Sequence, residues 1–148
     1  MAKALVIYAT RTHQTRKIAE LIAAGIRQEN AEATVVDVNE ASKMVPQLSE
    51  FDALVIGSAT YHGEMLQSMK TFLFELEKAD LEGKVGGAFG AFGWSGEAPP
   101  RIYNTLKHVL RMDMVGGPLM LKSATMQGGV KMAQDYGREV ARKMLAKS

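Results

Sequence analysis

Residues 5–22, LVIYATRTHQTRKIAELI, combine three sequence patterns in one short stretch. Residues 5–9 form an apolar run, which is typical of a β-strand buried on both faces. Residues 18–22 carry apolar side chains at helical spacing. The turn between them, residues 10–17, contains three threonines and no glycine. The stretch therefore predicts a strand that passes through a polar turn directly into a helix.

The same alternation of strand and helix continues to the end of the chain. Apolar, β-branched or glycine-rich runs predict strands at Lys3–Ala9, Ala33–Val38, Asp52–Ser58, Lys84–Phe92 and Met114–Leu121. Helical spacing of apolar residues predicts helices at Gln14–Glu29, Ala41–Leu48 (short or irregular because of Pro46), Met65–Leu76, Pro99–Arg111 and Val130–Ala146. Such alternation is typical of the α/β class, with five strands in a parallel sheet and helices on both faces. No linker or repeat interrupts it, so we expect a single domain over residues 1–148.

The composition excludes several classes of function. The formal net charge of +2 is small, and no Lys/Arg cluster alternates with aromatic residues, so we expect no nucleic-acid binding. The absence of cysteine excludes disulfides, cysteine-ligated iron–sulfur clusters and thiol catalysis. No apolar stretch is long enough to span a bilayer, and the N-terminal residues lack the layout of a signal peptide. We therefore expect no membrane association and a cytoplasmic location.

The polar turn after the first strand is the first candidate binding site. It offers the hydroxyls of Thr10, Thr12 and Thr15, together with the backbone N–H groups at the start of the helix. Those N–H groups have no intrahelical partner and lie at the positive end of the helix dipole, where they bind anions such as phosphate. One threonine could instead simply cap the helix. Capping would account for one threonine but not for three, so the turn favours a phosphate site.

Other signatures of nucleotide-binding and signalling proteins are absent. The chain has neither G-x-G-x-x-G nor G-x-x-x-x-G-K-[ST]. Asp37 could resemble a ribose-binding acid, but without those glycines we interpret it as a turn residue. A phosphorelay receiver domain needs acidic residues after the first and third strands. Here residues 8–10 are Tyr-Ala-Thr and residues 57–60 are Gly-Ser-Ala-Thr.

Two aromatic residues follow the third and fourth predicted strands. Tyr61 lies in GSATYHGEM, residues 57–65, and the only tryptophan, Trp94, lies in AFGWSGEAPP, residues 91–100. Loops that follow parallel strands meet at the carboxyl edge of the sheet, where ligands bind in such folds. Two aromatic side chains beside a phosphate site could sandwich a planar ring system. The alternative is that Trp94 packs back onto the sheet.

Three stretches resemble the flavodoxin family, and especially the flavodoxin domains of flavodiiron proteins. VIYATRTHQTRKIA, residues 6–19, is similar to the family's strand–[ST]-x-x-x-x-T–helix phosphate loop. FDALVIGSATYHGEM, residues 51–65, is similar to its GSPT loop, and AFGAFGWSGEA, residues 88–98, to its loop with a Gly-Trp pair. The similarity extends over residues 5–145. It implies a flavodoxin-like three-layer sandwich of the short-chain type, with sheet order 2-1-3-4-5.

The resemblance also implies a non-covalently bound FMN. Its phosphate would lie on the first loop, and its isoalloxazine ring between the Tyr61 loop and Trp94, with backbone atoms of the last two loops at the polar edge of the ring. The residues that the resemblance assigns to cofactor binding are Thr10, Arg11, Thr12, His13, Gln14, Thr15, Ser58, Ala59, Thr60, Tyr61, His62, Gly63, Phe92, Gly93, Trp94, Ser95, Gly96 and Glu97. No catalytic side chain and no metal ligand is predicted.

The implied function is electron transfer between a donor and an acceptor redox protein. Two departures from the family pattern leave alternatives open: His13 stands where the family usually has glycine, and the chain is slightly basic where typical flavodoxins carry an acidic rim. The missing rim, with His62 and Arg101 near the ring, gives some support to an oxidoreductase that acts directly on a quinone or another small molecule. A flavin-free signalling module on the same fold is a third possibility. The sequence predicts no oligomeric state.

Overall fold

The computed structural model describes residues 1–11, 13–92 and 96–147. Its strands are β1 Lys3–Ala9, β2 Glu32–Asp37, β3 Ala53–Ser58, β4 Thr60–Tyr61, β5 Glu64–Met65, β6 Val85–Ala91, β7 Asp113–Met114 and β8 Leu119–Leu121. Its helices are α1 Gln14–Gln28, α2 Val38–Ser42, α3 Gln67–Glu75, α4 Ala98–Asn104 and α5 Gly129–Lys147. Short helical segments of other types are η1 Val45–Glu50, η2 Leu76–Lys78 and η3 Thr105–Val109.

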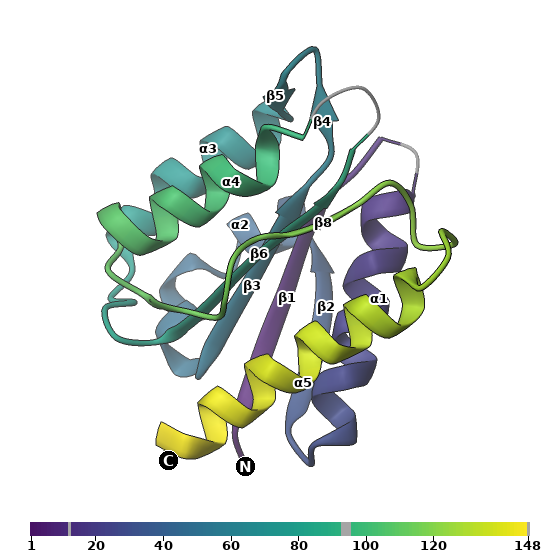
Figure 1. Ribbon diagram of the computed structural model, residues 1–148. Helices are drawn as coiled ribbons and strands as arrows, with labels where there is room; N and C mark the ends of the chain where they lie inside the picture. Colours follow the sequence, from purple (N-terminus) through teal and green to yellow (C-terminus); the bar gives the residue numbers. More distant parts are fainter. Residues whose placement is uncertain (12, 93–95, 148) are drawn as a thin grey trace.

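The main sheet is parallel, with the order β2-β1-β3-β6-β7, and β8 also pairs with β6. This confirms the predicted order, in which the first strand lies beside both the second and the third. All strands of this sheet point the same way, so the loops after β1, β3, β6 and β8 meet at one edge, the upper one in Figure 1. Both chain termini lie at the opposite edge.

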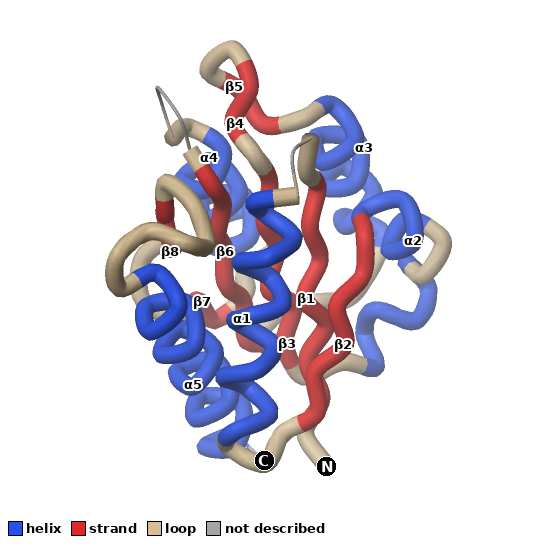
Figure 2. The backbone as a smooth tube through the Cα atoms, turned by 90° about the vertical axis from the view of Figure 1, so that its right-hand side faces the viewer, coloured by secondary structure: helices blue, strands red, loops and turns tan. Residues whose placement is uncertain are grey.

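Helices cover both faces of the sheet, as the alternation predicted. Helices α1 and α5 pack on one face, and α2, α3 and α4 cover the other (Figures 1 and 2). Every residue of β3 and β6 is buried, because these strands lie between two apolar layers. The edge strand β2 is only partly buried. Among the described residues, no helix has both the length and the apolar character needed to cross a membrane.

The last strand differs from the prediction, because it is interrupted. The predicted strand Met114–Leu121 is split into β7 and β8, which pair with opposite ends of β6. The interruption contains Gly116-Gly117-Pro118, where glycine disfavours extended structure and proline lacks a ladder donor.

A tyrosine of α5 pairs with the backbone groups of β6 that this interruption leaves without a strand partner. Tyr136 Oη accepts a hydrogen bond from the backbone N–H of Ala88 at 3.0 Å and donates one to the carbonyl oxygen of Ala88 at 3.2 Å. Gly87 provides the space, since a Cβ atom there would lie 2.9 Å from Tyr136 Oη. One phenol therefore replaces the pairing that a continuous strand would give to the middle of β6.

Other corrections concern the ends of helices. The predicted helix Ala41–Leu48 is the short α2 followed by the 3₁₀ segment η1, which begins one residue before Pro46. Met65 belongs to a hairpin rather than to α3, because residues 60–65 form β4 and β5. The fourth helix ends in a π-helical turn, η3. Asp37, interpreted from the sequence as a turn residue, is the last residue of β2, and its carboxylate accepts the N–H of Asn39 at 2.7 Å and caps α2.

Candidate functional site

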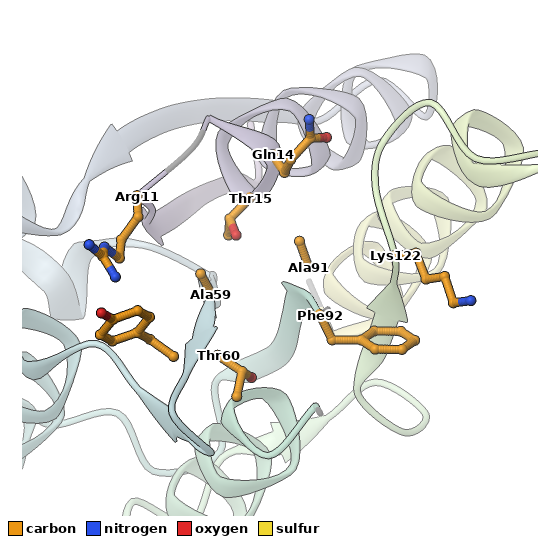
Figure 3. A pocket seen from close by; sticks show the side chains of 9 residues that line it. Arg11, Gln14, Thr15, Ala59, Thr60, Ala91, Phe92 and Lys122 are labelled. Carbon is orange, nitrogen blue, oxygen red and sulfur yellow. The ribbon is translucent and has the colours of Figure 1, made fainter. Parts of the chain in front are cut away.

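A cavity of about 500 Å³ opens at the carboxyl edge of the sheet (Figure 3). Its lining residues lie at or just after the carboxyl ends of β1, β3, β6 and β8, which the parallel sheet brings together. They are Arg11, Gln14, Thr15, Ala59, Thr60, Tyr61, Ala91, Phe92 and Lys122.

The cavity wall at the start of α1 carries buried oxygen atoms without partners. Thr10 Oγ1, Gln14 Oε1 and Thr15 Oγ1 are each inaccessible to solvent and form no hydrogen bond in the described structure. Thr15 is fully buried although its side chain is polar. A buried polar atom without a partner is costly in a folded protein. Three of them at one helix N-terminus indicate a place for a polar ligand that supplies the missing partners.

The turn before α1 leaves the first backbone N–H groups of the helix available. The N-cap residue is His13, whose side chain makes no capping hydrogen bond. His13 has φ 68°, in the left-handed region that glycine adopts most easily. Histidine at this position therefore adopts the backbone conformation that glycine would adopt most easily. Among the described threonines of the turn, neither Thr10 nor Thr15 caps the helix, so the capping alternative receives no support from them.

A two-residue hairpin borders the cavity at the end of β3. Tyr61 pairs with Glu64, and the turn residues His62 and Gly63 have φ values of 51° and 77°. Positive φ at both positions is the geometry of a type I′ turn. Tyr61 is 48% exposed, and the guanidinium carbon of Arg11 lies 3.8 Å from the centre of its ring. This cation–π contact joins the first loop to the hairpin.

Hydrogen bonds hold the loop after β3 in place and join it to the start of α4. Ser58 is fully buried, and its hydroxyl donates to the carbonyl oxygen of Ala59 and accepts the N–H of Leu66. Thr60 Oγ1 accepts the N–H of Ala98 at 3.1 Å, which ties the β3 loop to the start of α4. Glu97, the N-cap residue of α4, has a buried Oε2 atom without a partner.

The acidic residue of the hairpin is paired with two cations. Glu64 accepts a hydrogen bond from Lys70 Nζ at 2.8 Å and lies 3.7 Å from a guanidinium nitrogen of Arg101. The bond from Lys70 lowers the pKa of Glu64 below its usual value, and both nearby charges contribute in the same direction. Glu64 therefore stays ionised at neutral pH, and the two cations balance its negative charge.

Comparison with known proteins identifies the family. Residues 5–109 match the flavodoxin domain family. A flavodoxin of Aquifex aeolicus (strain VF5) is 39% identical over 146 residues, which are 95% of this chain and 75% of that protein. The chain belongs to the flavodoxin family.

Flavodiiron relatives share the same domain. The rubredoxin-oxygen oxidoreductase of Megalodesulfovibrio gigas is 26% identical over 147 residues, 98% of this chain but 36% of that protein. The chain spans about a third of the length of several curated relatives that it matches. Among solved structures, a flavodoxin from the domain Archaea superposes with a TM-score of 0.90 at 30% identity, covering 97% of this chain and 99% of that one. The predicted flavodoxin-like fold is thus confirmed.

Most residues that the flavodoxin resemblance assigned to the cofactor lie at or beside the cavity. Arg11, Gln14, Thr15, Ala59, Thr60, Tyr61 and Phe92 line it. Thr10 contributes an unpartnered oxygen, His13 and Ser58 shape the loops, and His62 and Gly63 form the hairpin turn. Gly96 and Glu97 line a separate cavity of about 380 Å³. Thr12, Gly93, Trp94 and Ser95 lie outside the described residues.

Sequence reasoning missed two lining residues, Ala91 and Lys122. Ala91 ends β6, and Lys122 is the first residue after β8. The rule that every loop at the carboxyl edge can contribute to a site would have drawn attention to Lys122, because it follows the last predicted strand.

Proposed function

We propose that this chain is an FMN-binding electron carrier that acts between a donor and an acceptor redox protein in the cytoplasm. FMN, when bound, supplies the redox chemistry, and the protein supplies binding, orientation and a controlled environment. The observation that carries the proposal is the set of unpartnered, buried oxygens of Thr10, Gln14 and Thr15 beside the N-terminus of α1.

These groups fit a phosphate ester. The threonine hydroxyls can donate to phosphate oxygens, and the Gln14 amide can present its NH₂ group after rotation. The helix N-terminus adds backbone donors and a favourable dipole. Arg11 lies in the same wall and supplies a positive charge. A phosphorylated ligand would thus satisfy polar atoms that are otherwise unpaired.

The remaining walls suit a flat ring with one polar edge. Tyr61 and Phe92 contribute aromatic surface, while Ala59 and Ala91 are small enough to leave room. Glu97 does not line this cavity, but it follows β6 at the same edge of the sheet, and its unpartnered Oε2 would be an acceptor for an N–H group of the ring. The stacking role of Trp94 stays a prediction from the sequence.

An optical redox experiment tests the proposal. The purified protein is loaded with FMN and reduced anaerobically, and electron transfer to and from redox proteins is followed by flavin absorbance. We expect reversible reduction and rapid exchange with a protein partner, together with slow turnover of NADPH and a quinone. A colourless protein that binds no FMN would contradict the proposal and would favour the flavin-free module.

The second candidate is an oxidoreductase that acts directly on a small molecule such as a quinone. It is favoured by one observation: the only acid of the hairpin is paired with Lys70 and Arg101, so the hairpin lacks the unpaired negative charge of an acidic docking rim for a redox protein. Fast, saturable quinone turnover without any protein partner would support this candidate over the carrier.

A further inference from the structure

Several cations around the cavity have no acidic partner in the part of the chain that the structure describes. Arg11, Lys17 and Lys122 are exposed, and the described structure contains no ion pair to any of them. Arg11 and Lys122 line the cavity, and Lys17 lies in the first turn of α1, three residues after the lining residue Gln14 and so on the same side of the helix. We call these three residues the basic rim.

Acidic residues in the same loops do not cancel the basic rim. Glu64 is matched by Lys70 and Arg101 together, and Glu20 is paired with Arg16 at 3.1 Å. Glu97 has one buried carboxylate oxygen. Residues 12 and 93–95 of these loops carry no charge by sequence. Within the loops alone, Arg11 and Lys122 are balanced by Glu64 and Glu97. When Lys17, Arg16 with its partner Glu20, and the two partners of Glu64 are included, six cations stand against three acids, so this part of the surface has a net positive charge.

Unpaired acids lie elsewhere on the molecule. Glu40, in α2, follows the edge strand β2. Glu77, Asp80 and Glu82 line a shallow cavity of about 330 Å³ after α3. Helix α3 runs back along the sheet, so this group lies at the amino edge, opposite the cavity (Figure 1). Among the described residues, unpaired charges of both signs thus lie outside the rim, because Arg111 lines the same shallow cavity and Glu40 follows a strand end at the carboxyl edge.

The arrangement of the rim suits a broad partner better than a small anion. In Figure 3, Arg11 and Lys122 lie at opposite ends of the cavity, and the amino group of Lys122 points away from it. The three cations come from different elements and do not converge on one point. Spread charges of one sign steer and orient a macromolecular partner. Arginine and tyrosine, which meet here as Arg11 and Tyr61, are also enriched in the centres of protein interfaces.

We propose that the basic rim is the docking surface for an acidic redox protein. This inference rests on the proposed electron-carrier function and adds the sign of charge that its partner presents. The partner would place its own redox centre over the mouth of the cavity, with carboxylates against Arg11, Lys17 and Lys122.

Binding to two proteins of opposite charge tests the inference. The FMN-loaded protein is titrated with an acidic plant-type ferredoxin and with basic cytochrome c. Salt is varied from about 10 mM, where the Debye length is about 30 Å, to about 150 mM, where it is about 8 Å. We expect the ferredoxin to bind more tightly than cytochrome c at low salt, and its affinity to fall roughly tenfold over this range. Tighter binding of cytochrome c, or an affinity for ferredoxin that is independent of salt, would overturn the inference.

A matched pair of variants separates local charge from net charge. Lys17→Glu changes the basic rim outside the cavity lining, and Lys78→Glu makes the same change in η2 at the opposite edge. We expect Lys17→Glu to weaken ferredoxin binding roughly threefold more than Lys78→Glu does. Equal effects of the two variants would overturn the inference. So would competition by inorganic phosphate beyond that of sodium chloride at equal ionic strength, which would indicate a small-anion site.

Flavin emission reports the proposed function separately. Quenched emission shows that FMN is bound before each titration. If FMN is not retained, the carrier function fails, while the same titrations of the flavin-free protein still show which sign of charge the rim attracts.

Discussion

Thr15 has a fully buried hydroxyl at the start of α1, and this hydroxyl has no partner in the described structure. An unpaired buried polar group costs about 1–3 kcal/mol, so the site is destabilising unless a ligand completes it. The hydroxyl should therefore lower the stability of the ligand-free protein and raise its affinity for the ligand.

The substitution Thr15→Val tests this opposition, because valine keeps the shape and removes the hydroxyl. We expect the flavin-free protein to become more stable by about 1 kcal/mol in urea unfolding. We expect FMN affinity to fall roughly 10- to 100-fold, since a hydrogen bond to a charged group is worth about 1.5–3 kcal/mol. Riboflavin, which lacks the phosphate, serves as the control ligand, and an equal loss for both ligands would contradict the phosphate assignment.

His13 adopts a left-handed conformation that costs an L-residue roughly 1–2 kcal/mol. Its side chain is exposed and caps nothing, so its removal loses little. We expect His13→Gly to raise the free energy of unfolding by about 0.5–1 kcal/mol, because the gain exceeds the added entropy of the unfolded chain. Lys17→Gly, within α1, is the control and should destabilise by about 1 kcal/mol. Destabilisation by both substitutions would show that the turn is not strained at His13.

At the scale of elements, the middle of β6 depends on α5. Tyr136 supplies the donor and the acceptor that the interrupted last strand cannot give to Ala88. We expect Tyr136→Phe to destabilise the fold by about 2–4 kcal/mol, since it leaves two buried backbone groups unpaired. Tyr103→Phe, at a partly buried phenol of α4 with no hydrogen bond recorded in the described structure, is the control for urea unfolding. A cost below about 0.5 kcal/mol for Tyr136→Phe would show that water or a strand shift replaces the phenol.

The burial of Tyr136 also predicts a dependence of stability on pH. Burial raises the pKa of Tyr136 well above its usual value, so the unfolded chain loses this proton first as the pH rises. The corresponding stability is complete below about pH 10, the ordinary pKa of tyrosine, and is lost above it. We expect the free energy of unfolding to fall above about pH 10 in the natural chain and to fall less in Tyr136→Phe. If the free energy of unfolding fell equally with pH in both proteins, Tyr136 would not be the group responsible.

Sequence patterns predicted secondary structure best for the strands in the middle of the sheet and for the long helices that pack on it. They predicted β1, β3, β6, α1 and α5 within a few residues, because strands buried on both faces and amphipathic helices have strong periodicities. They did not predict the β4–β5 hairpin or the π-helical turn η3. Both are local backbone features set by turn geometry and by tertiary packing rather than by periodicity.

At the scale of the molecule, the site follows from topology. A parallel sheet brings four loops to one edge, so the resemblance of three of them to flavodoxin loops was enough to predict most of the cavity lining. The basic rim was beyond sequence reasoning. The net charge of +2 does not show that Lys70 and Arg101 neutralise Glu64, or that Arg11, Lys17 and Lys122 form no ion pair in the described structure.

Calorimetric titration of the flavin-free protein with FMN and with riboflavin tests the central claim most directly. We expect one FMN to bind per chain with quenched emission, and riboflavin to bind at least about 100-fold more weakly, because only FMN satisfies the oxygens at the start of α1. Equal affinity for the two flavins, or no heat and full emission with FMN, would contradict the claim that this chain holds a phosphorylated flavin.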